Sequence, residues 1–220
     1  MHIIKQNTAK TGLLLIGLIF ILGGCQSVYY STLEKAGYHK RDILVERVGK
    51  ARNSQQEGKE QFKSALEKFS SVLNFKGGKL EDKYKQLNEE YENSEEAADD
   101  VRSRIDSVES VAEALFEEWQ DELKEYSNAS FKRDSKEKLH NTRSRYKKLI
   151  TAMRRAEKKM GPVLKAFKDQ VLYLKHNLNA KAIMSLQKEL RSVESNIAVL
   201  VKDMEKSIQE ADRFIREAGL

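Results

Sequence analysis

The only cysteine of this 220-residue chain, Cys25, directly follows a short apolar stretch and two glycines. Its thiolate is a strong nucleophile, and it is the best group in this part of the chain for the attachment of an acyl group. The residues before it, Leu22-Gly23-Gly24, give a processing peptidase the small side chains that it needs beside its cleavage site. The type and position of Cys25 therefore point to covalent modification of the N-terminal region.

The segment before Cys25 has the pattern of an export signal. The first ten residues carry two lysines and no acid, and an apolar run from Gly12 to Leu22 follows. That run is shorter than the roughly 20 apolar residues of a transmembrane helix. A basic start, a short apolar middle and small residues before a boundary are typical of a signal peptide. We predict a signal peptide over 1–24, a tether over 25–30 and a helical domain over 31–220.

The four residues Leu22-Gly23-Gly24-Cys25 resemble the lipobox of bacterial lipoproteins. The resemblance implies that Cys25 is acylated and that the chain is cut between Gly24 and Cys25. Each buried methylene contributes about 0.8 kcal/mol, so two or more acyl chains anchor a protein durably. Gln26, by its resemblance to enterobacterial sorting rules, favours the periplasmic face of the outer membrane over the inner membrane. The alternative is an uncleaved apolar anchor in which the cysteine is incidental.

No other motif predicts catalysis or metal binding. A di-iron helical bundle needs two Glu-x-x-His motifs and two further glutamates, and this chain has one such motif, Glu137 to His140. Leu139 belongs to an apolar seam, so we expect His140 to face outward. The sequence has no phosphate-binding glycine loop and no nucleophile elbow. We therefore expect no enzymatic activity, no metal and no cofactor.

Composition and periodicity predict long helices around this N-terminal site. A third of the residues are charged and the only proline is Pro162, which is typical of helical rods. Apolar residues recur every three or four positions and hold a seven-residue repeat. Four segments of similar length follow, at 31–75, 79–126, 131–175 and 180–218. Short turns between them predict an all-α fold, an elongated antiparallel four-helix bundle of coiled-coil type.

This topology orients the rod relative to Cys25. The turns at Gly77-Gly78 and at 176–179 would lie at the distal end, and the turn at 127–130 would lie near the membrane. Small residues are expected to share one layer of the core, with Ile197 from the last helix: Gly58, Ala98 and Ala156. Such a layer is either closed by a bend near Pro162 or leaves a ligand cavity.

The two middle segments carry opposite charge. Residues 79–126 include 17 acids and 6 bases, whereas residues 131–176 include 15 bases and 4 acids. Opposite charges favour pairing of these helices, and we expect several of six acids to approach the lysines or arginines of 132–168: Glu89, Glu92, Glu96, Asp99, Glu113 and Glu117. A basic run can also indicate nucleic-acid binding, which we do not expect for an exported protein. In a third interpretation, Lys132, Arg133 and Lys136 contact anionic headgroups.

The least polar part of the mature chain lies near the predicted distal turn. In Val171-Leu172-Tyr173-Leu174, apolar side chains point in every direction around one helical turn, and Leu172 falls outside the seam. Either the end of the first helix covers these residues or they form a docking surface. The candidate partner patch comprises Leu172, Tyr173, His176 and Phe75.

The stretch "GPVLKAFKDQVLYLKHNLNAKAIMSL" (161–186), together with the lipobox and the charged helical body, resembles the uncharacterised proteobacterial lipoproteins of domain-of-unknown-function family 2959. The resemblance implies an exported, helical, non-enzymatic protein, and it transfers no functional residues. We expect a lipid-anchored structural or interaction protein of the cell envelope, with the membrane and an envelope protein as partners and self-association possible. The alternative is a binding module for a lipid, glycan or peptide, held in the bundle core or on the basic flank.

Overall fold

The computed structural model describes residues 39–74 and 79–217, which form four helices and, within these ranges, no strand. The helices are α3 (Lys40–Leu73), α4 (Leu80–Glu125), α5 (Ala129–His176) and α6 (Ala180–Glu217). Gly24, Cys25 and Phe75 lie outside the described residues, as do the predicted signal peptide and tether. Among the described helices, none combines the length and the apolar composition that a membrane span requires.

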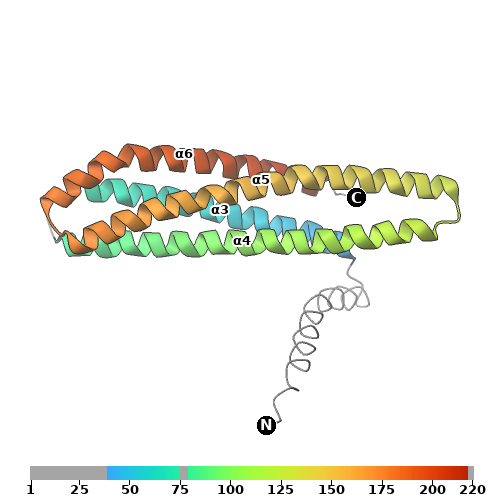
Figure 1. Cartoon of the computed structure of the whole chain (residues 1–220), viewed down its shortest axis with the longest axis horizontal. Helices are drawn as coiled ribbons and strands as arrows, with labels where there is room; N and C mark the ends of the chain where they lie inside the picture. Colours follow the sequence, from blue (N-terminus) through green and yellow to red (C-terminus); the bar gives the residue numbers. More distant parts are fainter. Residues whose placement is uncertain (1–38, 75–78, 218–220) are drawn as a thin grey trace, which may run out of the picture.

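The four helices form an elongated antiparallel bundle (Figure 1). Helix α3 packs against α4 and α6, and α5 packs against the same two helices, so α3 and α5 lie on one diagonal and α4 and α6 on the other. The longest helix, α5, has 48 residues, which corresponds to a rod of about 70 Å at 1.5 Å per residue. The predicted fold class and the pairing of the acidic helix with the basic helix are confirmed.

At two of the turns, a polar side chain caps the helix that follows. The Asn128 side-chain oxygen accepts hydrogen bonds from the backbone N–H of Ser130 (2.9 Å) and of Phe131 (3.1 Å) at the start of α5. Asn179 accepts a bond from Ala182 N at 3.0 Å and caps α6 in the same way. These bonds satisfy donors that the first turn of a helix leaves free.

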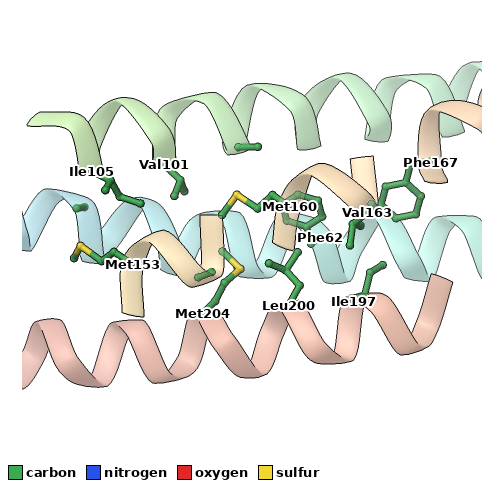
Figure 2. Packing of buried hydrophobic residues seen from close by; sticks show 14 of the residues in the cluster. Phe62, Val101, Ile105, Met153, Met160, Val163, Phe167, Ile197, Leu200 and Met204 are labelled. Atoms are coloured by element: carbon green, nitrogen blue, oxygen red, sulfur yellow. The ribbon is translucent and has the colours of Figure 1, made fainter. Parts of the chain in front are cut away.

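The predicted apolar seams form the core. Helices α3, α4, α5 and α6 contribute interdigitating side chains along the axis, several of which are labelled in Figure 2. The largest fully buried side chains include Phe62, Phe69, Ile105, Leu149, Met153 and Leu200. This packing orders the four helices relative to one another, because each seam is covered by two neighbours.

The expected layer of small residues is filled by a methionine. A Cβ atom placed on Gly58 would lie 3.3 Å from Met204 Cε and 3.5 Å from Val101 Cγ2. Met204, not Ile197, therefore faces Gly58, and Ile197 lies level with Val163 (Figure 2). The prediction that Ile197 shares this layer was wrong, because α5 and α6 align differently from the alignment assumed from the turn between them. The flexible side chain of Met204 occupies the space beside Gly58.

One layer of the core is polar. Gln55 and Ser207 are both fully buried, and neither the amide atoms of Gln55 nor the Ser207 hydroxyl has a hydrogen-bond partner within the described parts of the chain. Contacts between α3 and α6 on either side place the two residues at the same height, since Gly58 faces Met204 and Arg52 Nε lies 2.9 Å from Asp212 Oδ1. An unpaired buried amide is costly, so this layer weakens the core.

Helices α4 and α5 extend beyond the other two helices. Lys40, the first residue of α3, contacts Glu118 at 2.9 Å, and Arg145 contacts Glu217, the last residue of α6, at 3.2 Å. Past these contacts, no other described part of the chain accompanies α4 and α5 (Figure 1). We call residues 119–142 the hairpin and the remaining described residues the body. The bounds of α6 agree with the predicted segment 180–218, and its 38 residues are fewer than the 48 of α5.

Candidate functional site

Ion pairs join the acidic and basic helices at one place in the body. Arg154 on α5 reaches Glu109 on α4 at 3.2 Å and also binds Asp106. Arg102 on α4 binds Glu157 on α5 at 3.3 Å. The hydrogen bond to Glu109 raises the pKa of Arg154 above its usual value, against the opposing effect of partial burial. This cluster fixes the register of α4 against α5 more than it stabilises the fold.

The six acids expected to make these pairs do not make them. Within the described residues, none of them lies within ion-pair distance of a base of 132–168, and Asp99 pairs with Arg102 of its own helix at 2.8 Å. Only positions that flank the seam reach a neighbouring helix, whereas most acids of α4 point to solvent. Most bases of α5 are therefore exposed as well.

A basic groove lies between α5 and α6. It has a volume of about 390 Å³, and its lining includes three bases of α5 and one of α6: Lys147, Lys148, Arg155 and Lys206. The only acid in the lining is Glu210, which also binds Arg213 at 3.0 Å. A groove with this excess of positive charge suits an anionic group.

The hairpin carries exposed aromatic residues at its end. Tyr126 and Phe131 flank the turn, and their exposed fractions are 40% and 63%. Closer to the body, Trp119 Nε1 donates a hydrogen bond to Ser135 Oγ at 2.8 Å. The candidate headgroup residues, Lys132, Arg133 and Lys136, are exposed beside this turn.

A hollow of about 780 Å³ lies at the base of the hairpin. Tyr126 and Phe131 form part of its wall, and the charged side chains of the wall are Arg41, Lys138, Arg145 and Asp134. Three cations therefore face one carboxylate in a hollow with aromatic walls. The sequence did not suggest this hollow, because it depends on where α3 begins relative to α4 and α5.

The junction between the body and the hairpin is an aromatic contact. The rings of Phe116 and Tyr146 meet edge to face, with centroids 5.4 Å apart. Arg143 lies over the Phe116 ring at 5.3 Å and donates a hydrogen bond to the Phe116 carbonyl at 3.1 Å. Burial, together with the nearby Glu109 carboxylate, raises the pKa of Tyr146 to about 12.

The distal end carries the other concentration of exposed apolar residues. Leu172, Tyr173 and His176 are exposed there, so the described end of α3 does not cover them. Leu178 and Met184, which sequence reasoning missed, are exposed as well, and 62% of Met184 is accessible. The exposure of Met184 could have been predicted, because it follows the seam residue Ile183 and lies outside the heptad pattern.

The described residues include no cluster of three or more His, Cys, Asp or Glu side chains that could hold a metal ion. His140, from the single Glu-x-x-His motif, is exposed. The prominent features of the described surface are thus an apolar distal end, a basic groove and an aromatic hairpin, all of which suit binding.

Comparison with known proteins gives one match. No curated protein and no solved structure matches the chain. The model of a family described as "Protein of unknown function (DUF2959)" matches residues 29–218, which is nearly all of the chain after the predicted signal and tether. The chain belongs to this family.

Proposed function

We propose that this protein is a lipid-anchored, non-enzymatic interaction protein of the bacterial cell envelope. Acyl chains on Cys25 hold it on the periplasmic face of the outer membrane, and its distal end presents an apolar patch to a partner protein. The observation that carries the proposal is the exposure of Leu172, Leu178 and Met184 at the end of the rod opposite the start of α3.

Single exposed apolar residues are ordinary on a protein surface, but several at one end indicate an interaction site. The patch combines the last turn of α5, the connecting turn and the first turns of α6. Lys175 and Lys181 lie beside it in the sequence and are exposed. A partner with an apolar surface and acidic flanks would complement it.

The anchor is tested by the Cys25→Ser variant. It should lose metabolic labelling by palmitate and should leave the membrane fraction, because the nucleophile for acylation is gone. The Cys25→Ala variant serves as a second thiol-free control. A Cys25→Ser protein that stays in the membrane pellet after high-salt washing would favour an uncleaved apolar anchor instead.

The distal patch is tested by site-specific photocrosslinking in living cells. A photoreactive residue at position 184 should give a discrete crosslinked product, whereas one at position 199, an exposed valine halfway along α6, should not. The product should disappear when Leu172 is changed to Ser. Equal crosslinking from the two positions would contradict the patch.

The basic groove supports a second candidate function, the binding of an anionic glycan or lipid on the flank. The bundle core is less favoured, because Met204 fills the layer beside Gly58. Binding of lipopolysaccharide to the purified protein should weaken in an Arg155→Gln, Lys206→Gln variant and should become less dependent on salt. Lys188→Gln, an equally exposed change near the distal end, should have no effect.

A further inference from the structure

We propose that the end of the hairpin is a second membrane contact, in which Tyr126 and Phe131 enter the headgroup layer of an anionic bilayer beside Lys132, Arg133 and Lys136. This inference rests on the proposed lipid anchor at Cys25. With two points of contact, the anchor and the hairpin end, the rod would keep a defined orientation on the membrane.

The position of the hairpin is the first argument. The chain enters α3 at Lys40, which contacts Glu118, and α4 continues for seven more residues to Glu125. At 1.5 Å per residue the hairpin projects about 10 Å past this point. The 15 residues from Cys25 to Lys40 span at most about 50 Å, so the tether is long enough for the hairpin end to reach the surface that holds Cys25.

The aromatic side chains are the second argument. Phe131 is the most exposed of the large apolar residues in the described structure, and Tyr126 lies across the turn from it. The bonds from Asn128 fix the first turn of α5, and with it the backbone of Phe131, at the end of the rod. Aromatic residues concentrate at membrane interfaces, where an apolar ring is buried and polar groups remain hydrated.

The charge distribution is the third argument. Lys132, Arg133 and Lys136 are exposed on the α5 side of the turn, and bases near an anionic bilayer surface are attracted to it. The adjacent hollow adds Lys138, Arg41 and Arg145 on the same side of the structure. Three of the hairpin acids lie on α4, at 121, 122 and 125, and two lie on α5, at 134 and 137, where the four bases at 132, 133, 136 and 138 outnumber them. The α5 side therefore faces the lipid phosphates.

The size of the patch favours a membrane over a second copy of the chain. A buried aromatic side chain covers about 150–250 Å², and two partly exposed rings offer much less than the roughly 800 Å² per partner of a stable protein interface. A weak contact suffices for a tethered protein, because the anchor raises the effective concentration of the membrane to the order of millimolar.

The inference is tested with the full-length protein, purified with its acyl chains and reconstituted into vesicles that contain phosphatidylglycerol. Ser127→Cys places a polarity-sensitive fluorophore at the end of the hairpin, and Leu178→Cys places the matched probe in the distal turn. If Cys25 is acylated, only the introduced thiol reacts. We expect lipid-borne quenchers to quench the probe at 127 several-fold more than the probe at 178, with a blue shift only at 127.

Two further measurements separate the contributions of the side chains. Phe131→Ser should remove most of the quenching at 127 without changing the helical content, since the ring is exposed. Replacing Lys132, Arg133 and Lys136 by Gln should reduce the quenching of the probe at 127. The labelled protein that keeps these three bases should show the same loss on vesicles of phosphatidylcholine alone.

The outcomes distinguish the anchor from the hairpin contact. A chain that floats with the vesicles but shows no greater quenching at 127 than at 178 would overturn the hairpin contact and leave the anchor intact. A chain that does not float, and in which Cys25 itself reacts with the fluorophore, would overturn the anchor and this inference with it.

Discussion

Helices α4 and α5 run through both the body and the hairpin, yet apolar residues are buried in the body and exposed at the end of the hairpin. In the body, Phe62 and Phe69 on α3 are fully buried. In the hairpin, Phe131 is largely exposed, because α3 and α6 are not beside it. Two helices cover only the strip between them, whereas four enclose a core. The difference in helix length therefore creates a surface that a bundle of equal helices would not have.

Charges show the same contrast. In the body, Arg154 is partly buried between Asp106 and Glu109. In the hairpin, Arg133 is mostly exposed and lies 3.6 Å from its sequence neighbour Asp134. Exposed pairs of this kind contribute little to stability. Exposed bases at the hairpin end, such as Arg133, can therefore serve binding, while the charges of the body specify which helices pair.

The largest expected effect comes from changing a phenylalanine to alanine in the body and, for comparison, in the hairpin. Phe62→Ala should lower the free energy of unfolding by about 3–5 kcal/mol, because it leaves a cavity in a close-packed core. Phe131→Ala should change it by less than about 0.5 kcal/mol, because the ring contacts mainly solvent. Urea denaturation followed by circular dichroism measures both. A large loss from Phe131→Ala would mean that the hairpin end is packed, against the comparison drawn above.

A second prediction concerns the polar layer of the body. Gln55→Leu should raise the free energy of unfolding by about 1–3 kcal/mol, because it removes a buried amide that has no partner. Gln56→Leu, at an exposed position where the amide binds Glu60 at 3.0 Å, should leave it nearly unchanged. The same denaturation experiment tests both variants. A destabilised Gln55→Leu protein would show that the amide is satisfied in solution, for example by a buried water.

Much of the body followed from the sequence. The repeat in α3 placed Val48, Phe62 and Phe69 on one face, and all three are buried, since a seven-residue period leaves one stripe for the core. Leu172 was placed outside the seam and is exposed. Local rules also predicted the cap at Asn179, because such a bond involves only neighbouring residues.

The features that depend on alignment between helices did not follow. Met204 faces Gly58, and Arg154, from the expected basic range, pairs with Asp106 and Glu109 instead of with the six named acids. If one helix slides along its neighbour by one turn, every residue pair between the two helices changes, although the apolar pattern of the sequence stays the same. The hollow beside Tyr126 depends on where α3 and α6 stop, which composition and periodicity do not determine.

A third prediction uses neighbouring arginines of α5. Arg154→Gln should cost up to about 1 kcal/mol at low salt and less at high salt, because it removes the pairs with Asp106 and Glu109. Arg155→Gln is the matched control, since Arg155 is exposed and has no ion pair within the described ranges. Thermal unfolding at two salt concentrations distinguishes them. Equal, salt-independent effects would show that the α4–α5 cluster does not contribute to pairing.

At neutral pH the smallest effect, none, is expected at the junction, where Tyr146 contacts Phe116; the effect there is confined to high pH. Burial raises the pKa of Tyr146 to about 12 in the folded protein, against about 10 in an unfolded chain. The unfolded state therefore loses this proton first as the pH rises, and ionisation favours unfolding. The stabilisation is complete below pH 10 and is lost as the pH rises through 12.

Tyr146→Phe isolates this contribution, because phenylalanine keeps the ring contact and does not ionise. Its free energy of unfolding should match that of the unchanged protein at pH 7 and exceed it progressively between pH 10 and 12. Tyr91 also has a pKa raised to about 12, so the difference ultraviolet titration between the two proteins is needed to assign the signal to Tyr146. A tyrosine that ionises near pH 10 in that difference spectrum would place Tyr146 in the solvated hairpin and would move the boundary of the packed body away from the Phe116 contact.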